Sequence, residues 1–438
     1  MSVSRASLAA VVGIAMHLGI IGTPAVGASP EPTGELTLRQ AVELAFDGNP
    51  DLAAFSWEVR SGDARILQAG LIPNPDIGLE TEDIFGSGPF RNFDSSQTTL
   101  SIGQLVELGG KRAARVRLAS AGKEVAGWDY EARRADLAAE VAKAFVEVLS
   151  TQERVALSEE TTRLAEEVLN AVSARVTAGK ISPVEETKAR VAFSVSQIEQ
   201  ERVNRSLEAA RTKLAATWGS SRPVFSRAVG RLEQVTPIPS VEELAGRISR
   251  NPDIARWAME LEQRRAVLAQ ERAVRIPDVT ISAGIRRYRE TEAEETALVF
   301  GAAIPLPLFN RNQGKILESR YQVSRAERER QAAGNRVRAA LSEAYQALAI
   351  GYAEATTLKS VVLPGARSAF ESASEGFRQG KFGYLDVLDA QRTLFDARGR
   401  YVEALGAYHK AAADIERLIG GGLGDPSKST ETKRGSTE

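Results

Sequence analysis

The tripeptide Asn-Pro-Asp occurs twice in the chain, in "GNPDLAAF" (Gly48 to Phe55) and in "RNPDIARW" (Arg250 to Trp257), 202 positions apart. The same offset aligns Pro75-Asp76 with Pro277-Asp278, and an offset of 201 aligns the "AGK" at 178–180 with the "QGK" at 379–381. A period this long far exceeds that of solenoid repeats, so it indicates two copies of one large unit. We predict repeats at 29–220 and 241–420, a linker at 221–240 and a disordered tail at 421–438.

The motif itself reads as a boundary between helices. Asparagine is a favoured N-cap, proline suits the first turn of a helix, and an aspartate there complements the helix dipole. The residue before a proline is also driven out of the α region, which ends the preceding helix. We therefore expect a short helix at 37–47 to stop near Asn49 and a second helix to start there, with the same arrangement after 241–249 at Asn251. A paired ligand site is the alternative interpretation.

The composition excludes several kinds of chemistry. The 438 residues carry a formal net charge of −1 and no cysteine. Disulfides, thiolate catalysis, cysteine-based zinc sites and a cysteine-linked lipid anchor are therefore excluded, and nothing indicates binding of nucleic acid. The sequence has no His-Glu metal motif, nucleophile elbow or phosphate loop. We predict a protein that is not an enzyme and has no catalytic residue, cofactor or metal site.

The N-terminus has the pattern of a cleaved export signal at 1–28. Arg5 supplies the positive end, Leu8 to Ile21 is apolar, and small residues at 26–28 precede the expected cut. A membrane anchor is the alternative, but spanning a bilayer takes roughly 20 apolar residues and this run is shorter. We expect an exported chain without a transmembrane helix, in which His409 and Met259 are the remaining imidazole and thioether groups.

Each repeat contains two segments with strand-like alternation. They lie at 76–83 and 97–104 in the first repeat, and at 278–288 and 296–304 in the second. Apolar residues in them alternate with polar and small residues, which is the pattern of a sheet with one apolar face. Each segment is close to the length of about 9–11 residues that a tilted membrane strand needs.

Long helices follow the strands in both repeats. From Leu105 to Ala178, and again from Phe309 to Gln379, residues of high helix propensity recur at helical spacing. Pro364 marks a kink or a fresh start in the second run, and four glycines are candidate breaks in the first: Gly109, Gly110, Gly122 and Gly127. Roughly 70 helical residues span on the order of 100 Å. Such helices must pack laterally, in a coiled coil or a wall, because no globule could bury their apolar stripes.

Four membrane strands per chain constrain the assembly. An open sheet is forbidden in lipid, where its edge N–H and C=O groups stay unpaired. Two copies would close eight strands around an interior filled by side chains, whereas three would close twelve around a channel. The residues alone do not choose between two and three. We therefore predict a mainly α, internally duplicated chain that contributes four strands to an oligomeric membrane β-barrel.

Five stretches resemble the outer membrane efflux protein family, of TolC type: "LTLRQAVELAFDGNPDLAAF", "GLIPNPDIGLE", "GQLVELGGKRAARV", "PLPLFNRNQGKI" and "QGKFGYLDVLDAQRTLFDAR". The resemblance covers about Leu36 to Gly420, and "ELGGKR" with "NPDIGLE" resembles the branch that serves heavy-metal cation pumps. It implies a homotrimer with a twelve-stranded β-barrel in the outer membrane of a Gram-negative bacterium, in contact with its lipid, and a long periplasmic α-barrel. The protein would be the passive exit duct of a tripartite efflux system, docked to a periplasmic membrane-fusion adaptor and an inner-membrane RND-type pump.

The resemblance also assigns roles at the turns between the long helices. It implies that the tips at 178–182 and 379–383 contact the adaptor, through Ala178, Gly179, Lys180, Gln379, Gly380 and Lys381. It implies that Asp386 and Asp389 form an aperture gate, with six carboxylates in a trimer. Phe382 replaces a basic residue that latches the gate in the best-known family pattern. The alternative for the two aspartates is a solvated pair that stabilises the helix dipole.

Other functions are compatible with the same residues. The fold could serve drug efflux or type I protein secretion, because substrate choice lies largely with the pump. A periplasmic coiled-coil adaptor is a further alternative, although adaptors have one hairpin with globular β modules and no symmetric duplication. The scarcity of His, Met and Cys indicates that any metal selectivity is not made by soft ligands in this chain.

Overall fold

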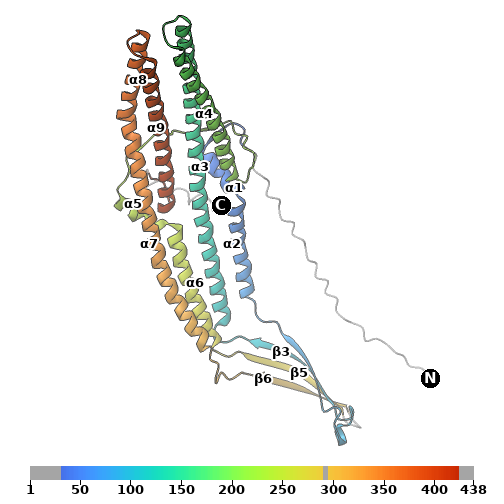
Figure 1. The fold of residues 1–438 in the computed structure, drawn as a ribbon. Helices are drawn as coiled ribbons and strands as arrows, with labels where there is room; N and C mark the ends of the chain where they lie inside the picture. The colour runs from blue at the N-terminus through green and yellow to red at the C-terminus, as the bar shows by residue number, and fades with distance from the viewer. Residues whose placement is uncertain (1–30, 290–293, 424–438) are drawn as a thin grey trace, which may run out of the picture.

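The computed structural model describes residues 31–289 and 294–423. The predicted signal peptide at 1–28, and all but the first three residues of the predicted tail, lie outside the described residues. The protomer is long and narrow, with a four-stranded sheet at one end and two helical hairpins reaching the other (Figure 1). Of the described helices, none combines the length and the apolar character that crossing a bilayer requires.

The elements of the two repeats follow the same order. The first repeat holds β1 (Glu35–Thr37), α1 (Leu38–Gly48), α2 (Pro50–Ala69), β2 (Asp76–Glu82), η1 (Gly88–Phe90), β3 (Gln97–Val106), α3 (Lys111–Thr177) and α4 (Pro183–Ala216). The second follows β4 (Arg227–Val229) and holds α5 (Val241–Arg247), η2 (Ile248–Arg250), α6 (Pro252–Val274), β5 (Val279–Arg289), β6 (Glu294–Ala303), α7 (Gln313–Thr357), η3 (Leu358–Val362), α8 (Leu363–Arg378) and α9 (Tyr384–Ile419).

The asparagine of each Asn-Pro-Asp motif caps a helix and also joins two helices. Asn251 is fully buried, and its Oδ1 accepts hydrogen bonds from the N–H groups of Asp253 (2.9 Å) and Ile254 (3.3 Å). Its Nδ2 donates to the carbonyl of Leu418 in the last turn of α9, at 3.0 Å. Asn49 does the same between α2 and the end of α4, donating to the carbonyl of Thr217 at 2.8 Å. The motif therefore fastens the end of the return helix of each repeat to the start of α2 or α6 in the same repeat.

The long helices have fewer breaks than the glycines suggest. Helix α3 begins after Gly109 and Gly110, which both have positive φ, and it continues through Gly122 and Gly127 for 67 residues. At Gly122 a Cβ would lie 3.2 Å from the Gln263 amide of α6, so the glycine permits close helix packing instead of ending the helix. In the second repeat Pro364 has no N–H to donate to the preceding turn, and the chain widens there into the π-helical segment η3.

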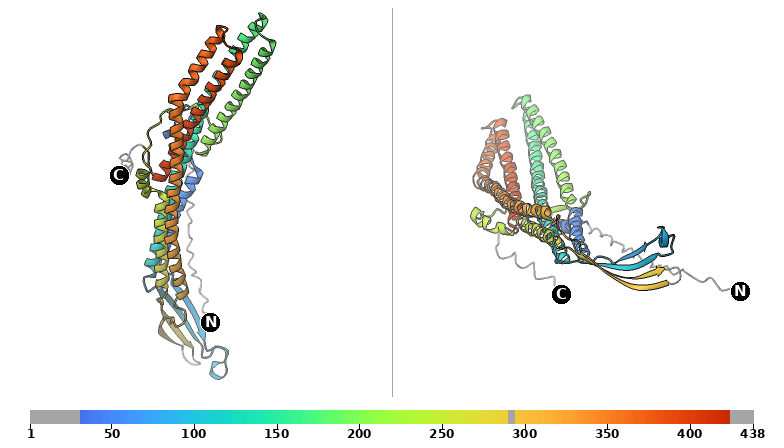
Figure 2. Two further views of the ribbon diagram at one scale, coloured as in Figure 1. Left: turned by 60° about the vertical axis from the view of Figure 1, so that its left-hand side comes forward. Right: turned by 90° about the horizontal axis from the view of Figure 1, so that it is seen from below.

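The helices form a wall one layer thick, and its order changes along the molecule. Near the sheet the neighbours are α2, α3, α6 and α7, while beyond the middle they are α4, α3, α9 and α8 (Figures 1 and 2). Helix α3 belongs to both halves of the wall. Two buried clusters lie in the middle, where the short helices α1 and α5 pack on the wall. One includes Leu137, Phe145 and Phe225, and the other includes Leu341, Leu348 and Ile415.

The sheet has the order β2-β3-β5-β6, and all its neighbouring strands are antiparallel. Its register places large apolar side chains on one face, which stays exposed in the protomer: Ile77, Leu79, Leu100, Ile102, Ile281, Ile285, Leu298 and Phe300. The other face carries polar and small residues. Since β2 and β6 each have one neighbour, the sheet has two unpaired edges.

Ionic contacts hold the strands to the long helices. Lys111, the first residue of α3, pairs with Asp278 beside β5 at 2.7 Å, and Asp278 also accepts from the Leu108 N–H at 3.0 Å. Arg115 pairs with Glu107, and this hydrogen bond lowers the pKa of the Glu107 carboxyl. The "ELGGKR" stretch is therefore a rigid joint that ties the first repeat to the second.

The segment at 221–240, predicted only as a linker, crosses the middle of the protomer and holds two long helices together. We call this segment the strap; its contacts were not predicted. The linker at 221–240 contains β4, which pairs in parallel with β1. The Gln152 amide of α3 both donates to the carbonyl of Ala228 and accepts from its N–H, each at 2.9 Å, as a neighbouring strand would. Further along, the Tyr408 hydroxyl of α9 donates to the Thr236 carbonyl at 3.0 Å. The strap thereby binds α3 and α9 together at mid-height.

The double role of Asn251 gives the first prediction. Asn251→Asp keeps the oxygen that caps α6 but loses the N–H that binds the Leu418 carbonyl, so a buried carbonyl is left unpaired at a cost of about 2 kcal/mol. We expect a lower thermal midpoint for the purified protein, measured at a fixed scan rate, and a larger drop for Asn251→Ala, which also loses the cap. Asn74→Ala, at an exposed position, is the control. A midpoint for Asn251→Asp equal to that of the unmodified chain would show that the link to α9 adds no stability.

Candidate functional site at the hairpin tips

Both helical hairpins end in the same turn. The predicted tip residues Ala178, Gly179 and Lys180 join α3 to α4, and Gln379, Gly380 and Lys381 join α8 to α9; all six are exposed. Gly179 and Gly380 have φ angles of 69° and 72°, which favour glycine, and the N–H that follows each of them donates to a carbonyl of the preceding helix at 2.9 and 2.8 Å. The tips lie at the end of the protomer opposite the sheet (Figure 1).

Arg175 connects the two tips. Its Nη2 donates to the Phe377 carbonyl at 3.1 Å, and its guanidinium carbon lies 4.0 Å from the centroid of the Phe377 ring. Arg175 stands in the last turn of α3 and Phe377 in the last turn of α8. This contact was not predicted, because an arginine near a helix C-terminus is explained by the helix dipole alone.

Asp386 and Asp389 stand on the first turns of α9 and are both exposed. The Oδ2 of Asp386 accepts a hydrogen bond from the Gly383 N–H at 2.8 Å, so this carboxylate caps the helix. Within the described residues the Asp389 carboxylate has no hydrogen bond or ion pair. At the matching positions of the first repeat, Glu185 and Lys188 pair with each other at 3.0 Å. Only the second repeat therefore presents two like charges there.

Phe382 packs on the turn between α8 and α9. It is 50% exposed, and its ring lies over Gly376, where a Cβ would come within 2.1 Å of it. A glycine is needed at position 376 because a larger side chain would clash with the Phe382 ring, and not because the backbone there has a positive φ. The aromatic side chain covers the end of α8.

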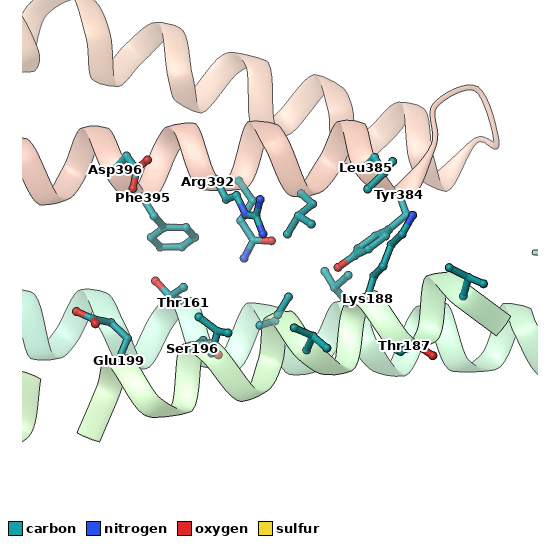
Figure 3. A pocket seen from close by; sticks show the side chains of 18 residues that line it. Thr161, Thr187, Lys188, Ser196, Glu199, Tyr384, Leu385, Arg392, Phe395 and Asp396 are labelled. Carbon is teal, nitrogen blue, oxygen red and sulfur yellow. The ribbon is translucent and has the colours of Figure 1, made fainter. Parts of the chain in front are cut away.

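An apolar groove of about 610 Å³ separates the hairpins next to the tips (Figure 3). Its floor comes from α3 and its walls from α4 and α9, including Val168, Val191, Val195, Leu388 and Phe395. Tyr384 projects into it from the start of α9 (Figure 3), and burial raises the pKa of its hydroxyl. Polar side chains at its margin include Lys188, Arg392 and Asp396.

Below the groove, ion pairs join the hairpins. They connect α3 to α9 in antiparallel order, from Asp136–Arg417 through Lys143–Asp414, Glu147–Lys410 and Arg154–Glu403 to Glu160–Arg398. Beyond Glu160, towards the tips, the described residues form no further ion pair between α3 and α9. The two hairpins are therefore held by charges at mid-height, and at the tips by Arg175 and a small buried cluster around Val172 and Tyr384, with the groove between.

The described residues also show how the side chains that could hold a metal ion are grouped. They contain no cluster of three or more His, Asp or Glu side chains placed to hold a metal ion. The Nε2 of His409 lies 2.8 Å from the Leu232 carbonyl in the strap, which leaves this imidazole in a structural contact.

Comparisons with known proteins agree with this geometry. The profile of the family described as outer membrane efflux protein matches residues 41–220 and 247–421. The cobalt-zinc-cadmium resistance protein CzcC of Cupriavidus metallidurans is 41% identical over 400 residues, covering 91% of this chain and 94% of that protein. The pyoverdine export outer membrane protein OpmQ of Pseudomonas putida is 25% identical over 422 residues, covering 90% of this chain and 87% of that protein.

A solved structure gives the same fold. The crystal structure of the Campylobacter jejuni CmeC outer membrane channel matches with a TM-score of 0.70 at 16% identity, over 88% of this chain and 86% of that chain. The predicted fold class is thereby confirmed: a mainly α chain of long helical hairpins with a sheet of four strands per protomer.

The contact of Arg175 with Phe377 predicts how the tips separate. The chain has no cysteine, so spin labels can be attached to cysteines placed at Ala178 and Gln379 without other changes. We expect Arg175→Ala to lengthen and broaden the distance distribution between the labels, because the described residues supply no other polar link between the tips. Arg378→Ala is the matched control, since Arg378 pairs with Glu375 of its own helix. Equal distributions for Arg175→Ala and the unmodified protein would contradict a holding role.

Proposed function

Because the chain belongs to the outer membrane efflux protein family, we propose that it is the exit duct of a tripartite system that removes heavy-metal cations. The identification made from its motifs is confirmed, including the heavy-metal branch to which CzcC belongs. The protein is an outer-membrane efflux channel, and the family consists of channels and not of enzymes. The observation that carries the metal assignment is the 41% identity to CzcC along nearly the whole length of both proteins.

A homotrimer is the assembly that we propose for the duct. Each protomer has a four-stranded sheet with free edges at β2 and β6, and lipid does not tolerate such edges. Apolar side chains are also exposed on the outer helices of the wall, with Trp57 and Leu67 on α2 and Leu317 and Tyr321 on α7. Three copies joined edge to edge would cover these side chains and close twelve strands, which leave room for a channel.

We assign the outer end of the path to the sheet and the periplasmic end to the tips. With its apolar face in outer-membrane lipid, the sheet holds the wall of helices in the periplasm. The six exposed tip residues at 178–180 and 379–381 are then the first part of the duct that an adaptor meets. An inner-membrane RND-type pump would supply the energy, because nothing in the described residues indicates that the duct itself consumes any.

The gate assignment rests on charge and on symmetry. Three protomers would bring six carboxylates, from Asp386 and Asp389, to one constriction that repels anions and binds divalent cations. Asp386 also accepts the Gly383 N–H at the start of α9, so it has a structural role besides the proposed gate role. Asp389 has no such structural duty in the described residues, which makes it the better candidate of the two for a purely electrostatic role.

The substrate can be tested in cells. We expect deletion of the gene to sensitise the source bacterium to cobalt, zinc or cadmium, by about tenfold in inhibitory concentration, while resistance to detergents and dyes stays unchanged. Growth at graded metal concentrations measures this, with a plasmid copy as the control for polar effects. Sensitivity to dyes and detergents instead would favour drug efflux, and loss of a secreted protein would favour type I secretion; either result would contradict the metal assignment.

The assignment of Asp386 and Asp389 as an aperture gate can be tested by single-channel recording. In planar bilayers, Asp386→Asn with Asp389→Asn should raise single-channel conductance, and half-block by a divalent cation should need a roughly tenfold higher concentration (about 1.4 kcal/mol). Asparagine is chosen because its side-chain oxygen can still accept the Gly383 N–H, so the α9 cap is kept; alanine at both positions would remove cap and charge together. Glu371→Gln, at an exposed position on α8, is the control. Conductance and block equal to those of the unmodified protein would contradict the gate assignment.

A further inference from the structure

The face of the sheet opposite the apolar side chains has a distinctive charge pattern. If the apolar face lies in lipid, as the proposed function requires, the opposite face lines the channel; we name it the lumen face. Its middle rows are small and neutral, with Gly78, Ser101 and Gly284 side by side and Ser282 beside Gly301. Charged side chains stand at its ends.

Four carboxylates and one guanidinium occupy the lumen face of the described strands. The carboxylates belong to Asp76, Glu80, Glu82 and Glu295, and the guanidinium to Arg286. Glu80, Thr99 and Arg286 stand in one row across three strands, and Glu82, Gln97, Tyr288 and Glu295 stand in the next row towards the loops. The acidic side chains therefore gather at the end of the sheet that lies far from the helices, except for Asp76.

Arg286 is fully engaged by its neighbours. Its Nε donates to the Thr99 hydroxyl at 2.9 Å, its Nη1 donates to the Gln97 side-chain oxygen at 3.2 Å, and its Nη2 pairs with Glu82 at 3.2 Å. Thr99 is buried, and the Arg286 side chain is 26% exposed. The Arg286 guanidinium thus lies along the lumen face of the sheet, where it cancels the charge of Glu82.

The other carboxylates are not cancelled. Glu80 and Glu295 form no ion pair with any described residue, although Arg286 stands in the same row as Glu80. The next arginine along the strand, Arg287, points to the opposite face and pairs there with Glu294. Each protomer therefore presents free negative charge on the lumen face near the outer mouth, and three protomers would form a ring of it.

We propose that Glu80, Glu295 and Arg286 set the charge selectivity of the β-barrel lumen, separately from the aperture at the tips. Fixed charges in a channel with low-dielectric walls produce potentials of several kT, and rings of carboxylates favour cations over anions. Free carboxylates would attract metal cations that have passed the aperture, while the paired Arg286 keeps Glu82 from adding to the ring. Weak attraction of this kind lets cations leave, which tight coordination would prevent.

The inference can be tested apart from the gate. The channel is reconstituted in planar bilayers with Asp386→Asn and Asp389→Asn as background, so that the aperture carboxylates are absent, and the ratio of K⁺ to Cl⁻ permeability is taken from the reversal potential in dilute KCl. Glu80→Gln with Glu295→Gln should lower this ratio by at least about threefold. This is a modest change, because fixed charges in a cleft produce potentials of several kT. Arg286→Gln should raise it, because a positive charge is lost and Glu82 is freed.

Matched controls separate charge from structure. Arg287→Gln removes the same charge from the adjacent residue on the lipid face and should leave the ratio unchanged. All differences should shrink in about 1 M salt, where the screening length falls to about 3 Å from about 10 Å at 0.1 M. The Glu80 and Glu295 side chains form no hydrogen bond or ion pair within the described residues, so their variants should fold even if Arg286→Gln weakens the barrel.

The outcomes distinguish this inference from the proposed function. An open channel whose permeability ratio is the same with and without Glu80 and Glu295 would overturn the inference and leave the duct intact. A ratio that changes equally for Arg287→Gln would also overturn it, because the effect would not depend on the lumen face. If the unmodified protein forms no channel, the proposed function itself fails.

Discussion

The free edges of the sheet, at β2 and β6, are the constraint on which the rest of the structure depends. Their backbone groups cannot be left unpaired in lipid, where each would cost several kcal/mol. The cost disappears only when other copies supply the missing strands. Because the helices next to the sheet stand in the same order as the strands, α2-α3-α6-α7 beside β2-β3-β5-β6, any assembly that closes the sheet also brings the outer helices of neighbouring copies together. A duct of helices is thus the consequence of a closed barrel of strands.

The duplicated repeat supplies the fastenings that such a duct needs. Gly110 and Asn312, 202 positions apart, both have left-handed backbone angles immediately before a long helix, so each repeat turns from strand to helix in the same way. Asn49 and Asn251 then fasten the returning helix of each repeat to its beginning. Between them the strap binds α3 and α9 at mid-height. The lower part of each protomer is therefore tied at many points, whereas the described hairpins above Glu160 are joined by Arg175 and by a small buried cluster around Val172 and Tyr384, beside an apolar groove.

Patterns that repeat over many residues could be predicted from the sequence, and single tertiary contacts could not. The helical spacing from Leu105 to Ala178 and the alternation around Ile77 and Leu100 predicted long helices and strands, and the motifs identified the family. Strands β1 and β4 have three residues each, too few to show a period, so the strap was missed. The contact of Arg175 with Phe377 was also missed, because the sequence of neither helix shows which other helix will lie beside it. Gly122 was taken as a candidate break because a sequence does not show that α6 approaches there.

The carboxylates proposed to act in the path lie at positions where the two repeats differ, whereas the positions that the repeats share build the fold. The aligned positions of Glu80 and Glu82 in the second repeat are Ser282 and Gly284, which are small and neutral. The aligned positions of Asp386 and Asp389 in the first repeat are Glu185 and Lys188, which neutralise each other. At these aligned positions the first repeat alone brings carboxylates to the barrel and the second alone brings an unneutralised pair to the tips, while β6 of the second repeat adds Glu295 to the lumen face. A duct made of two identical repeats would have acid at both sites in every hairpin and every strand pair, with like charges repelling one another around the ring. On the proposed function, divergence after duplication leaves carboxylates at each end of the path, and rings of carboxylates favour cations over anions.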